Sequence, residues 1–231
     1  SMPVLTGSLI CVPLGIWTDR FGGRIVLFLL MISTVIPIYL ISYATANWHF
    51  LVLGLLVGLA GGSLKVGTPY VARWFKKDRQ GLAMGIFGAG NSGAAVNKFT
   101  APAIIASAGW VMVPKVYAVM MLAAALIFWA FSSTDPSHNV KSTASFTEQL
   151  KMLKDPKVWR YCQYYSVVFG GYVGLSLWMV KYYVTEYDFD MKDAALLAAC
   201  FSLPGGVLRA FGGWLSDKYG AYKVTWWVMW V

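Results

Sequence analysis

Long, nearly uncharged apolar blocks recur along the whole chain and constrain its fold more than any other feature. The only charged residues in the interior of these blocks are Lys65, Lys98 and Arg209, and two further cations, Arg24 and Lys115, are the first residues of their blocks. The blocks cover 24–44, 50–72, 81–108, 115–133, 161–180 and 194–216. About 20 helical residues cross the hydrocarbon core of a bilayer, so each block is a candidate span. With 58% hydrophobic and only 13% charged residues, the composition also excludes an ordinary soluble domain.

The pattern predicts an all-α polytopic membrane protein with about six full spans and two partial ones, the partial spans being at the two ends. The lipid bilayer is therefore its first expected partner, and a multi-pass position in the cytoplasmic (inner) membrane is its expected location. The expected helical segments are 1–17, 24–44, 50–75, 81–108, 111–131, 159–183, 192–215 and 224–231.

The net charge of +9 is distributed unevenly between the loops. Most lysines and arginines fall in alternate loops, at 20–24, 73–79, 141–160 and 218–223, while the other loops hold few cations and several acids. This asymmetry follows the positive-inside rule and predicts that the basic loops, including the long polar stretch at 134–157, face the cytoplasm. A nucleic-acid-binding face should be contiguous, so nucleic acid is not an expected partner.

Neither the cysteines nor the histidines have a spacing that suggests chemistry. Cys11, Cys162 and Cys200 lie in or at the edge of apolar blocks, and His49 and His138 stand alone in polar loops. Small buried thiols explain the cysteines better than a disulfide or a metal site. We expect no catalytic residue, metal or cofactor, and therefore no enzyme.

One loop and its flanking helices recur 198 positions later in the chain. Gly7, Gly15, Asp19, Arg20, Phe21 and Gly22 register on Gly205, Gly213, Asp217, Lys218, Tyr219 and Gly220. The two copies share chain direction, so we expect two parallel repeats, the arrangement of secondary transporters that bind substrate at the midplane. The predicted organisation is an N-terminal half at 1–133, a linker at 134–157 with a short amphipathic helix near 146–153, and a C-terminal half at 158–231.

The first copy reads G-I-W-T-D-R-F-G-G-R from Gly15 to Arg24 and resembles the G-x-x-x-D-R-x-G-G-R loop motif of the major facilitator superfamily. Its fixed positions are Gly15, Asp19, Arg20, Gly22, Gly23 and Arg24. The second copy is a weaker match through Gly213, Asp217, Lys218 and Gly220. The resemblance implies a gating and helix-locking role, against the alternative of a plain turn. Asp19 is suited to accept from helix N-terminal amides or from a neighbouring arginine.

The resemblance also suggests which part of such a transporter this chain represents. If the linker follows span 6 of a 12-span protein, the chain corresponds to spans 2–9, and we expect it to be a fragment. Within the superfamily, the Gly-rich segment at 81–93 resembles the signature of nitrate/nitrite porters, and so does the segment with Arg209 before Gly212 and Gly213. This implies transport of nitrate, with nitrite as a further substrate.

Arg209 is the predicted anion ligand. None of the ten acidic residues lies well inside a span, so a transported oxyanion is its natural counter-ion, against the alternative of a structural arginine bonded to helix carbonyls. By resemblance, Tyr165 and Phe169 sandwich the flat anion. Asn91 is a candidate donor and Gly88 lets a helix approach closely.

The resemblance implies a pair of arginines, one in each half, but Cys11 stands in register with Arg209. Lys65 is a candidate replacement cation, whereas Lys98 is expected to snorkel toward the membrane surface.

Coupling and several alternatives stay open. Nitrate/nitrite exchange needs only a fixed cation. The detailed sequence of the segments at 50–75 and 81–108, however, resembles the proton-coupled nitrate transporters. A porter for another small organic anion or solute is the first alternative, and a non-transporting membrane protein, channel or enzyme is the second. We expect a monomer.

Overall fold

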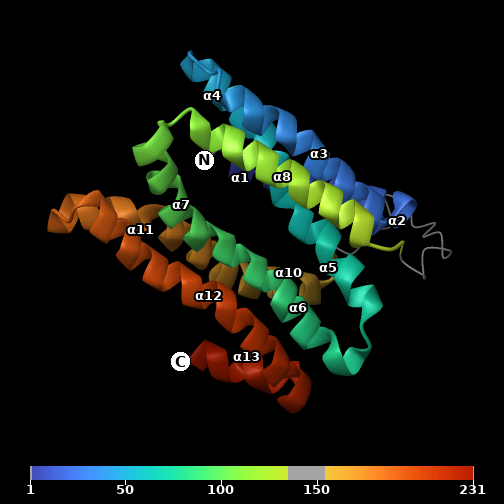
Figure 1. Cartoon of the computed structure of the whole chain (residues 1–231). Coiled ribbons are helices and arrows are strands. Elements are labelled where there is room, and N and C mark those ends of the chain that lie inside the picture. Colours follow the sequence, from blue (N-terminus) through green and yellow to red (C-terminus); the bar gives the residue numbers. More distant parts are fainter. Residues whose placement is uncertain (1, 135–153, 231) are drawn as a thin grey trace. The chain divides into compact units, whose positions relative to one another are not determined.

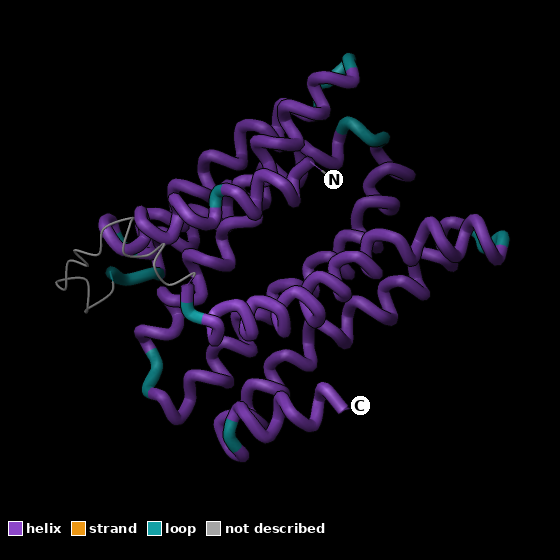
Figure 2. Tube along the Cα trace, turned by 180° about the vertical axis from the view of Figure 1, so that it is seen from behind, coloured by secondary structure: helices purple, strands orange, loops and turns teal. Residues whose placement is uncertain are grey.

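Every regular element in the described part of the chain is a helix. The computed structural model describes residues 2–134 and 154–230, and Figure 2 shows only helix and loop there. The predicted amphipathic helix near 146–153 and His138 lie outside these residues. The α-helices are α1 (Met2–Leu9), α2 (Cys11–Phe21), α3 (Gly23–Ile41), α4 (Asn47–Val57), α5 (Ser63–Trp74), α6 (Gln80–Ala89), α7 (Gly93–Ala108), α8 (Met112–Phe131), α10 (Pro156–Tyr165), α11 (Gly171–Tyr187), α12 (Met191–Tyr219) and α13 (Ala221–Trp230) (Figure 1).

Three of the predicted spans contain a short irregular turn. A 3₁₀ turn at Gly58–Gly62 joins α4 to α5, another at Gly90–Ser92 joins α6 to α7, and a π turn at Ser166–Gly170 joins α10 to α11. Glycine is a poor helix former, which accounts for irregularity at the first two places. π turns and 3₁₀ turns within a helix often mark functional positions.

The helix bounds confirm the predicted fold class. Each expected segment coincides with one helix or with two helices separated by a brief break. Among the described residues, five stretches are long and apolar enough to cross a membrane: 23–41, 47–74, 112–131, 156–187 and 191–219. Many large apolar side chains on them are exposed, such as Leu29, Leu126 and Trp178. Lipid tails are the natural solvent for such a surface, so these side chains need no protein cover.

The chain divides into two compact units, of which the first comprises 1–76 and 101–142. Here α3 packs along α8 and against α4 and α5. The buried core of this unit consists of Leu14, Val26, Leu27, Leu30 and Val66. Gly23 is needed at the start of α3, because a Cβ there would lie 2.8 Å from the Tyr70 Cβ.

The second unit comprises 77–100 and 143–231. Its central element is the long helix α12, which packs along α6 and against α11 and α13. The close approach of α6 to α12 uses the small residues of the Gly-rich segment, as expected for helices in lipid. The predicted halves follow chain order, whereas these units follow packing, and the two divisions differ in where they put 77–100.

Candidate functional site

The two copies of the repeated loop have the same backbone conformation. Gly22 and Gly220 end their helices with φ of 86° and 90°, values that favour glycine. Each glycine N–H donates to the carbonyl four residues earlier, from Gly22 to Thr18 at 2.9 Å and from Gly220 to Ser216 at 3.0 Å. The sequence repeat is therefore a repeat of local structure.

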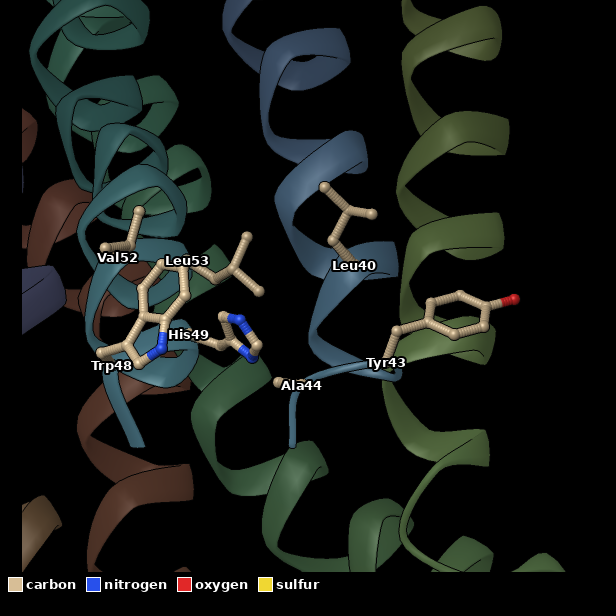
Figure 3. Close-up of a pocket in the computed structure, with 7 residues that line it drawn as sticks. All are labelled: Leu40, Tyr43, Ala44, Trp48, His49, Val52 and Leu53. Carbon is tan, nitrogen blue, oxygen red and sulfur yellow. The ribbon is translucent and has the colours of Figure 1, made fainter. Parts of the chain in front are cut away.

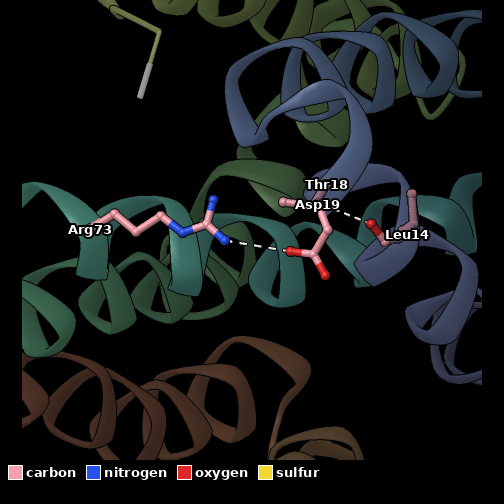
Figure 4. A network of polar contacts seen from close by, with 4 residues as sticks. All are labelled: Leu14, Thr18, Asp19 and Arg73. Atoms are coloured by element: carbon pink, nitrogen blue, oxygen red, sulfur yellow. Dashed lines mark hydrogen bonds and ion pairs between the residues drawn. The ribbon is translucent and has the colours of Figure 1, made fainter. Parts of the chain in front are cut away.

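The aspartates of the two loops have different partners. Asp19 accepts from Arg73 Nη2 at 3.4 Å, a partly exposed ion pair (Figure 4). Asp217 instead caps α6: its Oδ1 accepts from the Gly81 N–H at 2.7 Å and its Oδ2 from the Leu82 N–H at 2.8 Å. Both partners suggested for Asp19, an arginine and helix amides, thus occur, one at each copy. A carboxylate at a helix N-terminus satisfies orphan donors and the helix dipole together.

The remaining loop-motif residues have mainly packing roles. Arg24 Nη2 donates to the Trp129 carbonyl at 2.7 Å and Nε to Ser132 Oγ at 3.1 Å, which caps the C-terminus of α8. Lys218 lies over the rings of Trp214 and Tyr219. A Cβ on Gly213 would collide with the Gly81 carbonyl. Arg20 is exposed, and a Cβ on Gly15 would meet open space.

Arg209 lies on α12 at a place where α6 approaches closely. A Cβ on Gly85 would collide with the Arg209 carbonyl and lie 2.9 Å from the Ala210 Cα. One turn further on, a Cβ on Gly88 would lie 3.2 Å from the Arg209 Cδ. Gly88 therefore makes room for the arginine side chain itself.

Two aromatic rings lie close to the Arg209 guanidinium. Its Cζ lies 5.5 Å from the ring centroid of Phe169 and 5.7 Å from that of Tyr172, both within cation–π range. Phe169 belongs to the π turn and stacks on Tyr165 with centroids 5.1 Å apart. Sequence reasoning singles out Tyr165 and Phe169 but misses Tyr172, although its spacing of three from Phe169 in a helical segment was available as a signal.

Tyr172 is held firmly against α12. Its hydroxyl donates to the Ser202 carbonyl at 2.9 Å, and its ring stacks on Phe201. A Cβ on Gly205 would lie 2.7 Å from the Tyr172 ring. The ring beside Arg209 is therefore positioned by a hydrogen bond, a stacking contact and a glycine.

The site has donors without acceptors. Within residues 2–134 and 154–230, no carboxylate or carbonyl accepts from the partly buried Arg209 guanidinium. The Asn91 Nδ2 is buried and has no partner in the same described residues. Asn91 lies in the 3₁₀ turn one residue before Ser92, whose backbone and Cβ pack on Gly206 of α12. Buried unsatisfied donors call for an acceptor, and a small anion supplies one.

Lys98 does not snorkel, contrary to the expectation from sequence. Its Nζ turns inward and donates to the Ala198 carbonyl at 3.2 Å and to Ser202 Oγ at 3.1 Å. The physical reason is that α12 presents two acceptors beside α7, and these acceptors solvate the ammonium.

Cys11 and Lys65 belong to the other unit. The Cys11 thiol donates to the Gly7 carbonyl at 2.9 Å, an ordinary contact within the helical segment. Lys65 is exposed on α5. The pairing of either residue with Arg209 stays a prediction.

A small cavity of about 260 Å³ lies where α3 turns into α4 (Figure 3). It is lined mainly by apolar side chains, together with His49 and Trp48. His49 Nδ1 accepts from the backbone N–H groups of Thr45 and Ala46 at 3.4 and 3.3 Å, so it caps the start of α4. None of the residues predicted to bind substrate lines this cavity.

Long apolar helices and an arginine with unsatisfied donors define a multi-pass membrane protein with a cationic site between helices. The model of the Major Facilitator Superfamily matches residues 1–231, and the chain belongs to this family. The family consists of transporters, which agrees with the expectation that the chain is not an enzyme.

The curated relatives are named for nitrate and nitrite. The chain is 41% identical, over 98% of its length, to a probable nitrate/nitrite antiporter NarK1 of Thermus thermophilus, and covers 54% of that protein. It is 29% identical over 97% of its length to a nitrite extrusion protein of Bacillus subtilis, covering 56% of it. It is 31% identical over 97% of its length to a probable nitrate transporter NarT of Staphylococcus haemolyticus, covering 58%. The chain spans about half the length of these relatives.

Proposed function

We propose that this chain serves the secondary active transport of nitrate, and of nitrite, across the cytoplasmic membrane by alternating access. One observation carries the proposal: the guanidinium carbon of Arg209 lies 5.5 and 5.7 Å from the ring centroids of Phe169 and Tyr172, and the guanidinium has no acceptor among the described residues. A planar guanidinium offers paired donors to a planar oxyanion. The names of the relatives support nitrate and nitrite as the anions.

Each predicted site residue has a role in this proposal. Arg209 binds the anion, Asn91 donates its free amide hydrogens, and Phe169 and Tyr172 shield the charge pair from competing water. Tyr165 backs the Phe169 ring, and Gly88 keeps the Arg209 side chain against α6. Lys65 is a weaker candidate for a second cation. The basic loops and the linker face the cytoplasm, and the protein acts as a monomer.

The test is nitrate uptake by the gene product that carries this sequence, reconstituted in liposomes. Arg209→Gln should raise the KM for nitrate about tenfold or abolish uptake, because it removes charged hydrogen bonds. Lys181→Gln is the matched control, since Lys181 is an exposed cation on α11 that lies over Trp178. Absence of any nitrate-dependent flux in the wild type would overturn the proposal.

The same liposomes distinguish the coupling modes. A nitrate/nitrite antiporter requires internal nitrite and ignores an imposed proton gradient, whereas a nitrate/proton symporter responds to that gradient without internal nitrite. If formate or another small carboxylate inhibits nitrate uptake more strongly than nitrite does, the result supports the alternative of an organic-anion porter.

A further inference from the structure

Lys98 has a setting that nothing in the transport proposal explains. Its ammonium donates to the Ala198 carbonyl and Ser202 Oγ, and both of these residues are fully buried. An ammonium has three N–H donors, and the third finds no acceptor within residues 2–134 and 154–230. No carboxylate of these residues lies within ion-pair distance of it either.

A charge without a counter-ion is costly inside a span. Cationic side chains in membrane helices normally face a cavity, a partner or a transport path. Two neutral acceptors solvate Lys98 in part but do not neutralise it. A purely structural tether between α7 and α12 would be served as well by a neutral side chain.

Lys98 lies on the same seam as Arg209. Three successive contacts join α12 to the helices α6 and α7 and the turn between them. Gly88 lies against Arg209, Ser92 packs on Gly206, and Lys98 donates to Ser202. Ser202 and Arg209 are seven residues apart on one continuous helix, which puts them on one face about 10 Å apart. The two cations therefore stand two helical turns apart along one helix–helix contact.

Tyr172 connects the two positions. Its hydroxyl donates to the Ser202 carbonyl, while its ring flanks the Arg209 guanidinium. Ser202 thus accepts from Lys98 through its side chain and from Tyr172 through its backbone. Ser202 and Tyr172 therefore connect the surroundings of the two cations.

We propose that the Lys98 ammonium is a second binding station for the transported oxyanion, passed on the way to or from Arg209. The inference rests on the proposed function and adds a residue that the sequence motifs do not assign. The ligand is a small monovalent oxyanion, which accepts from the third N–H of Lys98 and replaces the missing counter-charge. Multiple weak sites of this kind let an ion enter without being trapped.

Four variants separate a station from a tether, with nitrate uptake in liposomes and the melting temperature in detergent as readouts. Lys98→Gln retains hydrogen bonding and loses charge, and Lys98→Met loses both. Lys98→Arg retains charge, and Ser202→Ala removes one acceptor while leaving the charge. For a station, the Gln and Met variants should raise the KM for nitrate about tenfold, while the Arg and Ala variants stay within about twofold of wild type.

A tether predicts a different pattern, in which Lys98→Met and Ser202→Ala lower the melting temperature and Lys98→Gln transports normally. Normal KM in Lys98→Gln overturns the proposal while leaving the Arg209 site intact. If Lys98→Gln does not accumulate, Lys98→Met and Ser202→Ala still decide between the two. If the wild type carries no nitrate, the proposed function and this station fall together.

Discussion

The carboxylate of Asp217 accepts from the backbone N–H of Gly81 at 2.7 Å, although 136 positions separate the two residues in sequence. Asp19, the corresponding residue of the first loop, accepts from Arg73 instead. Two loops with one motif and one backbone turn therefore stabilise two different kinds of contact: an ion pair and a capped helix.

We expect Asp217→Ala to lower the stability of the second unit by about 1–2 kcal/mol, because α6 loses its N-terminal cap. Thermal unfolding in detergent, followed by circular dichroism, measures the effect. Glu186→Gln is a suitable control, since Glu186 is an exposed carboxylate on α11. Equal melting temperatures for the two variants would refute the capping role.

Gly85→Ala should disrupt the packing of α6 on α12. The added Cβ collides with the Arg209 carbonyl, so the helices must separate. We expect a loss of about 1–3 kcal/mol, the usual range for overpacking. Gly90→Ala is the matched control, because a Cβ there meets no atom within 4 Å. Melting temperatures of the purified variants provide the comparison, and a tolerated Gly85→Ala would contradict the close approach.

Tyr172→Leu should weaken nitrate binding more than Tyr172→Phe. Leucine removes the ring that lies 5.7 Å from the Arg209 Cζ, whereas phenylalanine removes only the hydrogen bond to Ser202. A lost cation–π contact corresponds to roughly a two- to fivefold rise in KM. Uptake kinetics of both variants decide the point. The reverse order would assign the hydroxyl, and not the ring, to the site.

Cys11→Arg should tighten nitrate binding. It restores the arginine that the family pattern implies at the position in register with Arg209. The present Cys11 thiol only bonds the Gly7 carbonyl, so little structure is lost with it. Nitrate titration of the purified variant, with Cys162→Arg as a control for added charge, measures the change. An unchanged affinity would argue against a two-arginine clamp.

Arg24→Lys should destabilise the first unit although it keeps the charge. Lysine cannot reproduce the two hydrogen bonds to the Trp129 carbonyl and Ser132 Oγ, or the stacking on the Trp129 ring at 4.4 Å. We expect the free energy of unfolding to fall by about 1 kcal/mol, as measured by a lower melting temperature. Arg20→Lys, at an exposed position of the same loop, should have no effect. Identical behaviour of the two lysine variants would show that Arg24 contributes only charge.

Part of the site follows from sequence, and part does not. Arg209 and Gly88 stand out because a lone arginine and a Gly-rich segment are rare signals inside apolar spans, and the structure brings them together. Tyr172 is not predicted from sequence because the chain has 13 tyrosines, and only contact with the neighbouring helix distinguishes this one. The direction of Lys98 is predicted wrongly for the same reason: the acceptors that turn it inward lie on α12, about 100 positions away.

The sequence by itself determined the helices and the turns between them. Apolar runs of about 20 residues must satisfy their backbone groups internally in lipid, so their length and position suffice to place them. The glycines with positive φ at Gly22 and Gly220 likewise depend only on their own stretch of chain. The tertiary structure alone decided the partners of Asp19, Asp217 and Lys98. A side chain bonds whichever acceptor or donor its neighbouring helix presents, and that helix is remote in sequence.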